Sequence, residues 1–413
     1  MFSAVALLTA ATDQTARAQV PPAETLRAQI AASAADRNKP ETAPQLPTTH
    51  TSRNFVLHTD LPDADARDLL TRLETMLKII SRYWTRANQG VIECYVVQDL
   101  ARWPQGSLDS QALTNLRSGG GLTKGRVTRR GNRFLSKAIV YAVADRGTPQ
   151  HEAVHAYCIQ AFGRTGPVWY AEGMAEMGQY WIDGDARVNC PQVVVDYLRN
   201  TKLKSLNAIV NGTEVTGDSW QNYAWRWALC HLLANNSNYS KRFRPLGLAL
   251  LNKRDVSFES VYGSMAPEIA FEYRFFLKHL ERGYRVDLCR WDWKAKYRRA
   301  RGESPVVSQI RADRGWQSSH LVVRQGERYT YTAEGTWKLT KDGPSVGGDG
   351  TTETGGRLVG AVWDDYLLSD AFNLGAAEFT APQDGKLVLR CQDRWSQLAD
   401  NSGTLKVRIS ASP

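Results

Sequence analysis

Short apolar runs alternate with longer helical patterns over the first three quarters of the chain. Apolar runs of strand length lie at residues 55–59, 91–97 and 138–143. Apolar residues recur at the spacing of one helix face in the segments 64–85, 149–162, 168–181, 219–234, 241–251 and 267–282. The pattern predicts a small mixed sheet with helices over residues 53–303.

After Ser304-Pro305 the pattern changes to short alternating segments separated by turn residues. These segments are 321–323, 329–333, 357–363, 386–391 and 404–409. Regular spacing of this kind predicts an antiparallel β-sandwich over residues 304–413. The predicted fold class is therefore α+β.

The first 52 residues have the composition of an export signal followed by a tether. Residues 2–11 form an apolar stretch, and Ala16-Arg17-Ala18 fits an A-x-A cleavage site. We therefore expect a signal peptide over 1–18 and a flexible linker rich in Ala, Pro and Thr over 19–52. These predictions favour a secreted, periplasmic or cell-envelope protein. No apolar run reaches the roughly 18 residues of a transmembrane helix, so no transmembrane segment is expected.

Composition and charge add few constraints. A hydrophobic content of 42% is enough for packed cores, and the net charge is +10. Two basic clusters, 124–133 and 294–301, indicate either an anion-attracting surface or a solvated loop and a solvated helix face. No nucleic-acid-binding motif accompanies them, so we favour the second interpretation and expect no nucleic-acid partner. Six cysteines without a CxxC pair allow either disulfides, such as Cys190 with Cys230 or Cys289, or buried free thiols.

The strongest chemical signal is His151-Glu152-Ala153-Val154-His155 on the helix predicted for 149–162. Residues one turn apart share a helix face, so the two imidazoles can hold one Zn²⁺. Glu152 is rotated by about 100° around the helix, beside the open coordination position. From there its carboxylate can take a proton from zinc-bound water, which predicts that Glu152 is a general base.

A second acidic motif, WYAEGMAE, follows at residues 169–176. Glu172 follows His155 closely enough for a helix–turn–helix return, and we predict that it is the third zinc ligand. Glu176 lies one turn further on the same face. It is expected either to accept the outer N–H of a ligand histidine, His151 by preference, or to be a solvated carboxylate. Gly173 is expected to let this helix pack closely against the metal helix.

Together, HEAVH and WYAEGMAEM resemble the motifs of the gluzincin metallopeptidases, HExxH followed by WxxEGxAE or a close variant. The resemblance implies that His151, His155 and Glu172 bind zinc and that Glu152 is the base. It also implies that the strand at 138–143 corresponds to the substrate-binding edge strand of that clan. The chain lacks the GxMEN element of the exopeptidases, so the resemblance does not extend to aminopeptidase activity.

Hydrolysis also needs a hydrogen-bond donor facing the oxyanion. Gluzincins often supply it from a Tyr or His on a later helix, and the segment 219–227 is the best candidate here. Tyr223 is the first choice and His231 the second. For both residues the alternative is a purely structural place in the core of an aromatic-rich helix.

The C-terminal region resembles the LecA-type bacterial lectins, which are calcium-dependent, galactose-binding sandwiches. The matching residues are 315–317, 333–337, 358–360 and 400–403. In that pattern a late loop supplies calcium ligands, and Asp393, the Gln397 carbonyl, Asp400 and Asn401 have the matching spacing. Hard oxygen ligands suit Ca²⁺, so the resemblance implies a candidate calcium site and carbohydrate binding. The alternative is a polar hairpin loop.

The leading functional hypothesis is a zinc metallopeptidase that hydrolyses peptide bonds of extracytoplasmic proteins. Its accessory β-sandwich would bind a carbohydrate or a surface. The second hypothesis is a non-catalytic glycan-binding or scaffolding protein that retains the zincin fold. The intact Glu152 favours the first, because a scaffold needs no base.

Overall fold

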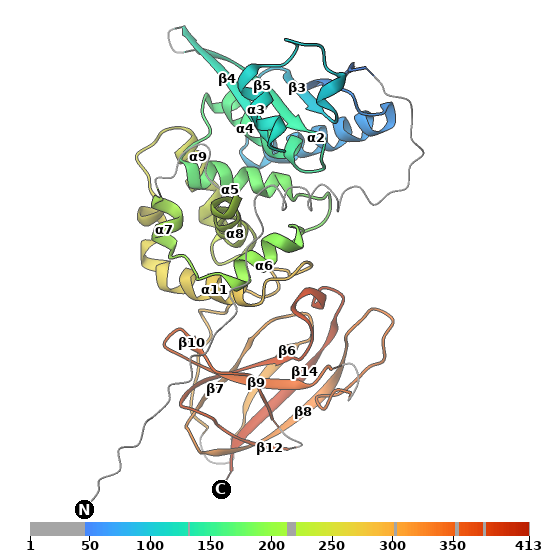
Figure 1. Cartoon of the computed structure of the whole chain (residues 1–413). Coiled ribbons are helices and arrows are strands. Elements are labelled where there is room, and N and C mark those ends of the chain that lie inside the picture. Colours follow the sequence, from blue (N-terminus) through green and yellow to red (C-terminus); the bar gives the residue numbers. More distant parts are fainter. Residues whose placement is uncertain are drawn as a thin grey trace, which may run out of the picture.

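A computed structural model describes residues 46–130, 133–212, 220–300, 304–351, 355–374 and 377–412, and for 127–130 and 133–135 only their backbone. The predicted signal peptide and most of the predicted linker lie outside these residues. A sheet with helices, a helical body and a β-sandwich follow one another along the molecule (Figure 1). This arrangement confirms the predicted α+β class. No helix among the described residues combines the length and apolar character that a membrane crossing requires.

The N-terminal sheet is five-stranded and mixed. Its strands are β1 (Thr48–Thr51), β2 (Phe55–Thr59), β3 (Ile92–Val97), β4 (Gly121–Arg130) and β5 (Arg133–Val143). In the order β1-β2-β3-β5-β4, the three central strands are parallel, and both edge strands are antiparallel to their neighbours. Two predictions are corrected. The end of the predicted linker is strand β1, and the edge strand beside the helix that carries the HExxH motif is β4 rather than β5.

Helices cover both faces of this sheet. Successive residues of a strand face opposite sides of the sheet. On one side, Ile92, Cys94 and Val96 of β3 join the main core with α2 (Asp63–Tyr83) and α4 (Thr148–Phe162). Val97 instead packs with Leu116 of α3 (Ser110–Arg117) in a separate cluster on the other face. A 3₁₀ turn, Leu100–Arg102, precedes α3.

The helical body is built around one central helix. Its members are α5 (Val168–Gln179), α6 (Gln192–Asn200), α7 (Leu206–Asn211), α8 (Trp220–Asn235), α9 (Ser240–Leu251), α10 (Phe258–Tyr262), the 3₁₀ turn Gly263–Met265 and α11 (Ala266–Lys278). Helix α8 is buried continuously from residue 224 to 233, because α5, α6, α7, α9 and α11 all pack on it. All six cysteines are free thiols, so the alternative of a disulfide at Cys190 is not realised.

The C-terminal domain is the predicted antiparallel sandwich. Its strands are β6 (Val306–Arg311), β7 (Gln317–Val323), β8 (Arg328–Lys338), β9 (Leu358–Asp364), β10 (Leu367–Leu368), β11 (Phe372–Asn373), β12 (Glu378–Thr380), β13 (Gly385–Cys391) and β14 (Ser402–Ala411). One sheet has the order β10-β9-β13-β7, with β11 paired to β9, and the other has the order β12-β8-β14-β6. Inward-facing residues of both sheets form one core, as alternation predicts.

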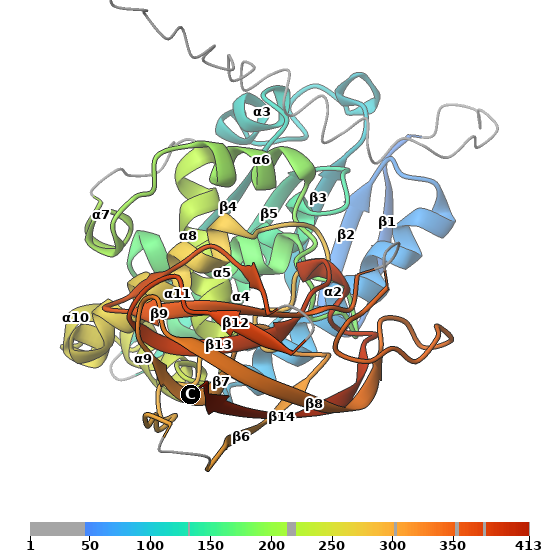
Figure 2. The ribbon, with the colours of Figure 1, turned by 90° about the horizontal axis from the view of Figure 1, so that it is seen from below.

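Seen from below, the sandwich strands lie under the helical body (Figure 2). An aromatic cluster joins the two. Phe271 of α11 lies with its ring centroid 4.8 Å from that of Trp291 and 6.3 Å from that of Trp363. The guanidinium of Arg274 donates a hydrogen bond to the carbonyl of Tyr366 in the β9–β10 turn, at 2.8 Å. The sandwich is therefore docked through side chains and not only tethered.

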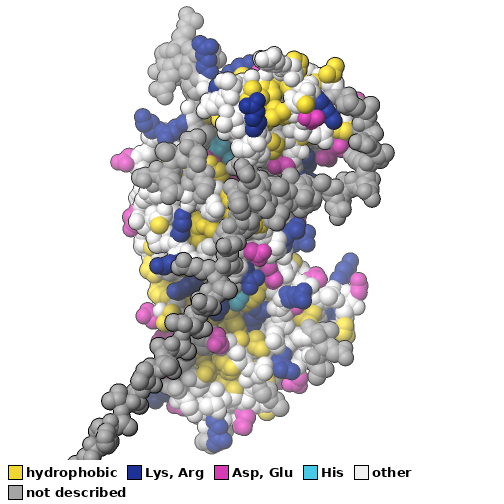
Figure 3. All heavy atoms as spheres, in the orientation of Figure 1, with side chains coloured by type: hydrophobic (Ala, Val, Ile, Leu, Met, Phe, Trp, Pro, Cys, Tyr) yellow, Lys and Arg dark blue, Asp and Glu magenta, His cyan; other side chains and the backbone are white. Residues whose placement is uncertain are grey.

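Both basic clusters differ from their predicted conformations. The described part of 124–133 is not a loop, because it belongs to strands β4 and β5. The described part of 294–301 is not helical and instead runs beside β7, where the Arg298 N–H donates to the His320 carbonyl. On the face shown in Figure 3, Lys and Arg side chains are interspersed with Asp and Glu.

Candidate functional site

Helix α4 presents the HExxH motif from a well-anchored first turn. The helix begins at Thr148, and Gly147 is the N-cap residue. The Asp145 carboxylate accepts hydrogen bonds from the N–H groups of Gly147 and Thr148, at 2.8 and 2.6 Å, and from the Thr148 hydroxyl, at 2.8 Å. Asp145 thus satisfies backbone N–H groups at the start of the helix, which have no partner within it. Gly163 ends the helix in a left-handed conformation (φ 73°).

The structure brings His151, His155 and Glu172 together. The Nε2 atoms of His151 and His155 are 3.2 Å apart. Glu172 Oε2 lies 3.5 Å from His151 Nε2 and 3.4 Å from His155 Nε2. Tetrahedral Zn²⁺ with bonds of about 2.0–2.1 Å separates its ligand atoms by about 3.3–3.4 Å. The three donor atoms therefore have the spacing of a zinc site with one corner open. Their side chains are 9%, 13% and 19% exposed, respectively.

Two glycines set the position of α5. A Cβ on Gly178 would lie 2.6 Å from Val154 Cγ2 of α4, so this glycine allows α4 and α5 to approach each other. A Cβ on Gly173 would lie 2.4 Å from Cys230 Sγ and 2.8 Å from the Arg226 carbonyl of α8. The close packing expected at Gly173 is present, but its partner is α8 and not the metal helix.

Glu176 stands behind the site, at the place that the sequence suggested. Its Oε1 is 3.2 Å from His151 Nδ1, while its side chain is only 6% exposed, so it is not a solvated carboxylate. The Tyr180 hydroxyl, one turn further along, also bonds to Glu176. Such a contact fixes the ring orientation and leaves Nε2 to face the open centre.

The charges around the centre complement one another. Burial favours the neutral form of Glu172, but the adjacent imidazoles of His155 and His151 outweigh this effect and hold the pKa of Glu172 well below its usual range. Burial disfavours a charged imidazole, yet contacts with Glu172 and Glu176 raise the pKa of His151. Two carboxylates thus favour a positive charge at this point, and a divalent cation can take the place of that proton.

A threonine that sequence reasoning missed contacts the predicted base. Thr123 on β4 places its hydroxyl 2.6 Å from Glu152 Oε2 and 2.9 Å from the Glu152 carbonyl. Gly121 on the same strand leaves room for the Glu152 side chain, since a Cβ there would lie 2.6 Å from Glu152 Cγ. No local pattern indicates either role, because the contact depends on how the hairpin folds back on α4.

The two candidates for an oxyanion donor separate in space. Tyr223, in the first turns of α8, lies with its ring centroid 6.2 Å from that of His151, and so it borders the site. The Arg226 guanidinium lies over the same Tyr223 ring, with Cζ 5.9 Å from the centroid. His231 is instead buried between Trp227 and Phe276 of α11. This position agrees with the alternative interpretation of His231, a structural residue in the core of the helical body.

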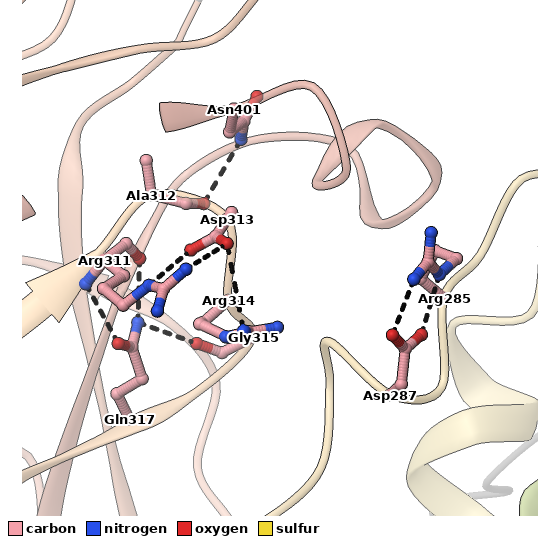
Figure 4. Close-up of polar contacts among 9 residues, drawn as sticks. All are labelled: Arg285, Asp287, Arg311, Ala312, Asp313, Arg314, Gly315, Gln317 and Asn401. Carbon is pink, nitrogen blue, oxygen red and sulfur yellow. Dashed lines mark hydrogen bonds and ion pairs between the residues drawn. The ribbon is translucent and has the colours of Figure 1, made fainter. Parts of the chain in front are cut away.

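The predicted calcium ligands lie on the loop between β13 and β14. The Asn401 amide nitrogen donates to the Ala312 carbonyl at 3.3 Å, beside the Arg311–Asp313 ion pair (Figure 4). Within the described residues, Asn401 Oδ1 and Asp393 Oδ2 are both buried and have no hydrogen-bond partner. The remaining candidates are Gln397, whose 3₁₀ turn spans Trp395–Gln397, and the exposed Asp400. A hard cation is one group that can satisfy a buried oxygen of this kind.

Comparison with known proteins adds little to this geometry. No family model matches the chain, and no curated protein matches it. Among solved structures, the chain is similar to "EclA N-terminal domain; PllA-like lectin", with 18% sequence identity and a TM-score of 0.23. The match covers 27% of this chain and 100% of that chain. The chemistry of the site must therefore be inferred from its own side chains.

Proposed function

We propose that the protein is a zinc-dependent metallopeptidase that hydrolyses peptide bonds of protein or peptide substrates, in agreement with the gluzincin-like motifs. The observation that supports this most is the triangle of His151, His155 and Glu172 donor atoms, with sides of 3.2–3.5 Å. The charge of Glu152, on the same helix as the two histidines, also acts on His151. Bound Zn²⁺ would polarise the scissile carbonyl and lower the pKa of a water molecule.

The side chains around the centre divide the remaining work. Glu152 would accept the proton of the attacking water and pass it to the leaving amine. Thr123 would hold that carboxylate in place through its 2.6 Å hydrogen bond. Tyr223, which borders His151, would donate to the oxyanion that forms at the scissile carbonyl.

The test combines metal analysis with peptide cleavage on the full chain. Glu152→Gln should keep its zinc and lose hydrolysis of a peptide library by about 100-fold or more. Glu378→Gln, the same change at an exposed position of the sandwich, should alter neither quantity. Cleavage that survives in Glu152→Gln or in chelated protein would refute the peptidase. Zinc bound by a wild-type protein that cleaves nothing would favour the non-catalytic glycan-binding or scaffolding alternative.

We also propose that the loop 393–401 binds Ca²⁺ and that the sandwich thereby attaches the enzyme to a carbohydrate or a surface. The buried oxygens of Asp393 and Asn401 without partners support a cation site. Calcium added to chelator-treated protein should raise its melting temperature, because a ligand that binds only the folded state stabilises it. Asp393→Asn should abolish that rise, and Asp342→Asn, at an exposed position elsewhere in the sandwich, should not. An equal rise in both variants would exclude this loop.

A further inference from the structure

A cavity of about 400 Å³ lies in the C-terminal half of the molecule, away from the metal site. It is placed where the edge strands β6 and β7 of the two sheets meet the segment that enters the sandwich. Its lining residues are Lys296, Tyr297, Arg298, Pro305, Val306, Val307 and His320. The proposed peptidase chemistry uses none of them.

The lining of the cavity combines two cationic side chains and His320 with apolar and aromatic residues. Lys296 and Arg298 are two positions apart in an extended segment, and Tyr297 stands between them. Lys386 adds a further cation nearby, with Nζ 5.6 Å from the Tyr297 ring centroid. No Asp or Glu is among the described residues that line the cavity. Such a lining attracts an anion and offers its organic part an apolar wall.

His320 is held in an unusual conformation at this cavity. It has φ 64°, a left-handed value that is unfavourable for most residues other than Gly. It lies in a bulge of β7, because Ser318 pairs with Val388 and Val322 pairs with Lys386 of β13. Residues 319–321 of β7 therefore lie opposite the single residue Leu387 of β13. Strained residues and bulges concentrate at functional sites, where they direct a side chain.

The surroundings of His320 also fix which ring nitrogen faces a ligand. Its Nδ1 lies 3.0 Å from the Lys296 carbonyl, which can only accept, so Nδ1 carries the proton. Nε2 is then the nitrogen left for an external group. Arg298 is anchored as well, because its Nη2 donates to the Pro305 carbonyl at 3.1 Å. Two of the three polar groups are thus pre-oriented before any ligand arrives.

We propose that this cavity binds a small organic oxyanion, a carboxylate, sulfate or phosphate group on a body that packs against Tyr297 and Val307. Lys296 and Arg298 neutralise the anion, and His320 contributes a directed hydrogen bond. The site is independent of the proposed peptidase activity, and binding here brings an acidic ligand to the sandwich.

The experiment measures binding of acidic sugars to the full chain by calorimetry at constant ionic strength. The probes are glucuronate, glucose 6-sulfate and glucose 6-phosphate, with neutral glucose as the reference. The variants are Lys296→Gln/Arg298→Gln and, as a control of equal charge loss, Arg328→Gln/Lys341→Gln on the same domain. His320→Asn is a further variant, because Asn tolerates left-handed backbone and lacks the ring.

We expect at least one acidic sugar to bind wild type and the charge-matched control with similar affinity, and glucose not to bind. Affinity should fall by roughly tenfold or more in the cavity double variant and should also fall in His320→Asn. The probe that binds best identifies the anionic group. Equal loss in the control variant, equal binding of glucose, or no binding of any acidic probe at millimolar concentration would overturn the proposal.

Discussion

Replacing Thr123 by Val tests whether β4 positions the base of the proposed reaction. The substitution keeps the β-branched shape, which suits a strand, and removes only the hydroxyl. That hydroxyl has one proton and two acceptors, Glu152 Oε2 at 2.6 Å and the Glu152 carbonyl at 2.9 Å. The shorter contact is to a carboxylate, so we expect the proton to be donated there.

The magnitude follows from the charge on the acceptor. A hydrogen bond to a charged group contributes about 1.5–3 kcal/mol, and its loss leaves Glu152 free to leave the productive orientation. If the whole of this free energy stabilises the transition state, its loss lowers kcat/KM by about 10- to 100-fold. Zinc affinity should not change, because Thr123 contacts the base and none of the three proposed ligands.

The assay is steady-state cleavage of a peptide selected from the library, with zinc content and melting temperature measured on the same preparations. Thr123→Ser retains the hydroxyl and should remain within a few-fold of wild type. A folded, zinc-loaded Thr123→Val enzyme with unchanged kcat/KM would refute the positioning role. A loss of zinc in that variant would show instead that β4 supports the metal helix as a whole.

Three further predictions concern metal affinity and stability. Glu176→Gln should weaken zinc binding by about 10- to 100-fold in a chelator competition, and an unchanged affinity would contradict its role behind the ligand. Gly173→Ala places a Cβ 2.4 Å from Cys230 Sγ, so unfolding free energy should fall by about 1–3 kcal/mol in a urea titration, whereas Gly347→Ala, with nothing within 4 Å, should be neutral. Burial lowers the pKa of His231 to about 4, so between about pH 6.5 and pH 4 the unfolded chain binds a proton at His231 that the folded protein does not bind. Stability should therefore fall by about 3 kcal/mol as the pH drops from about 6.5 to about 4, and His231→Phe should lose that part of the slope.

Local periodicity accounts for what the sequence predicted well. His151 and His155 share a face because they are one helical turn apart, and the same rule places Glu176 beside Glu172. The alternating segments after Pro305 form strands for the corresponding reason, since a strand repeats every two residues. These relations depend on backbone geometry over a few residues, which any chain segment of that pattern reproduces.

The remaining features depend on contacts between distant segments. The sequence could not show that β4 forms the sheet edge and brings Thr123 to Glu152, or that Gly173 packs on Cys230 of α8. Nor could it show that His320 is held in a left-handed conformation, in a bulge beside Lys296 and Arg298. Strand order, helix partners and backbone strain are set by how the whole chain closes on its core, where many weak contacts compete. The sequence alone therefore determined which groups could meet on one element, and the tertiary structure decided which elements met.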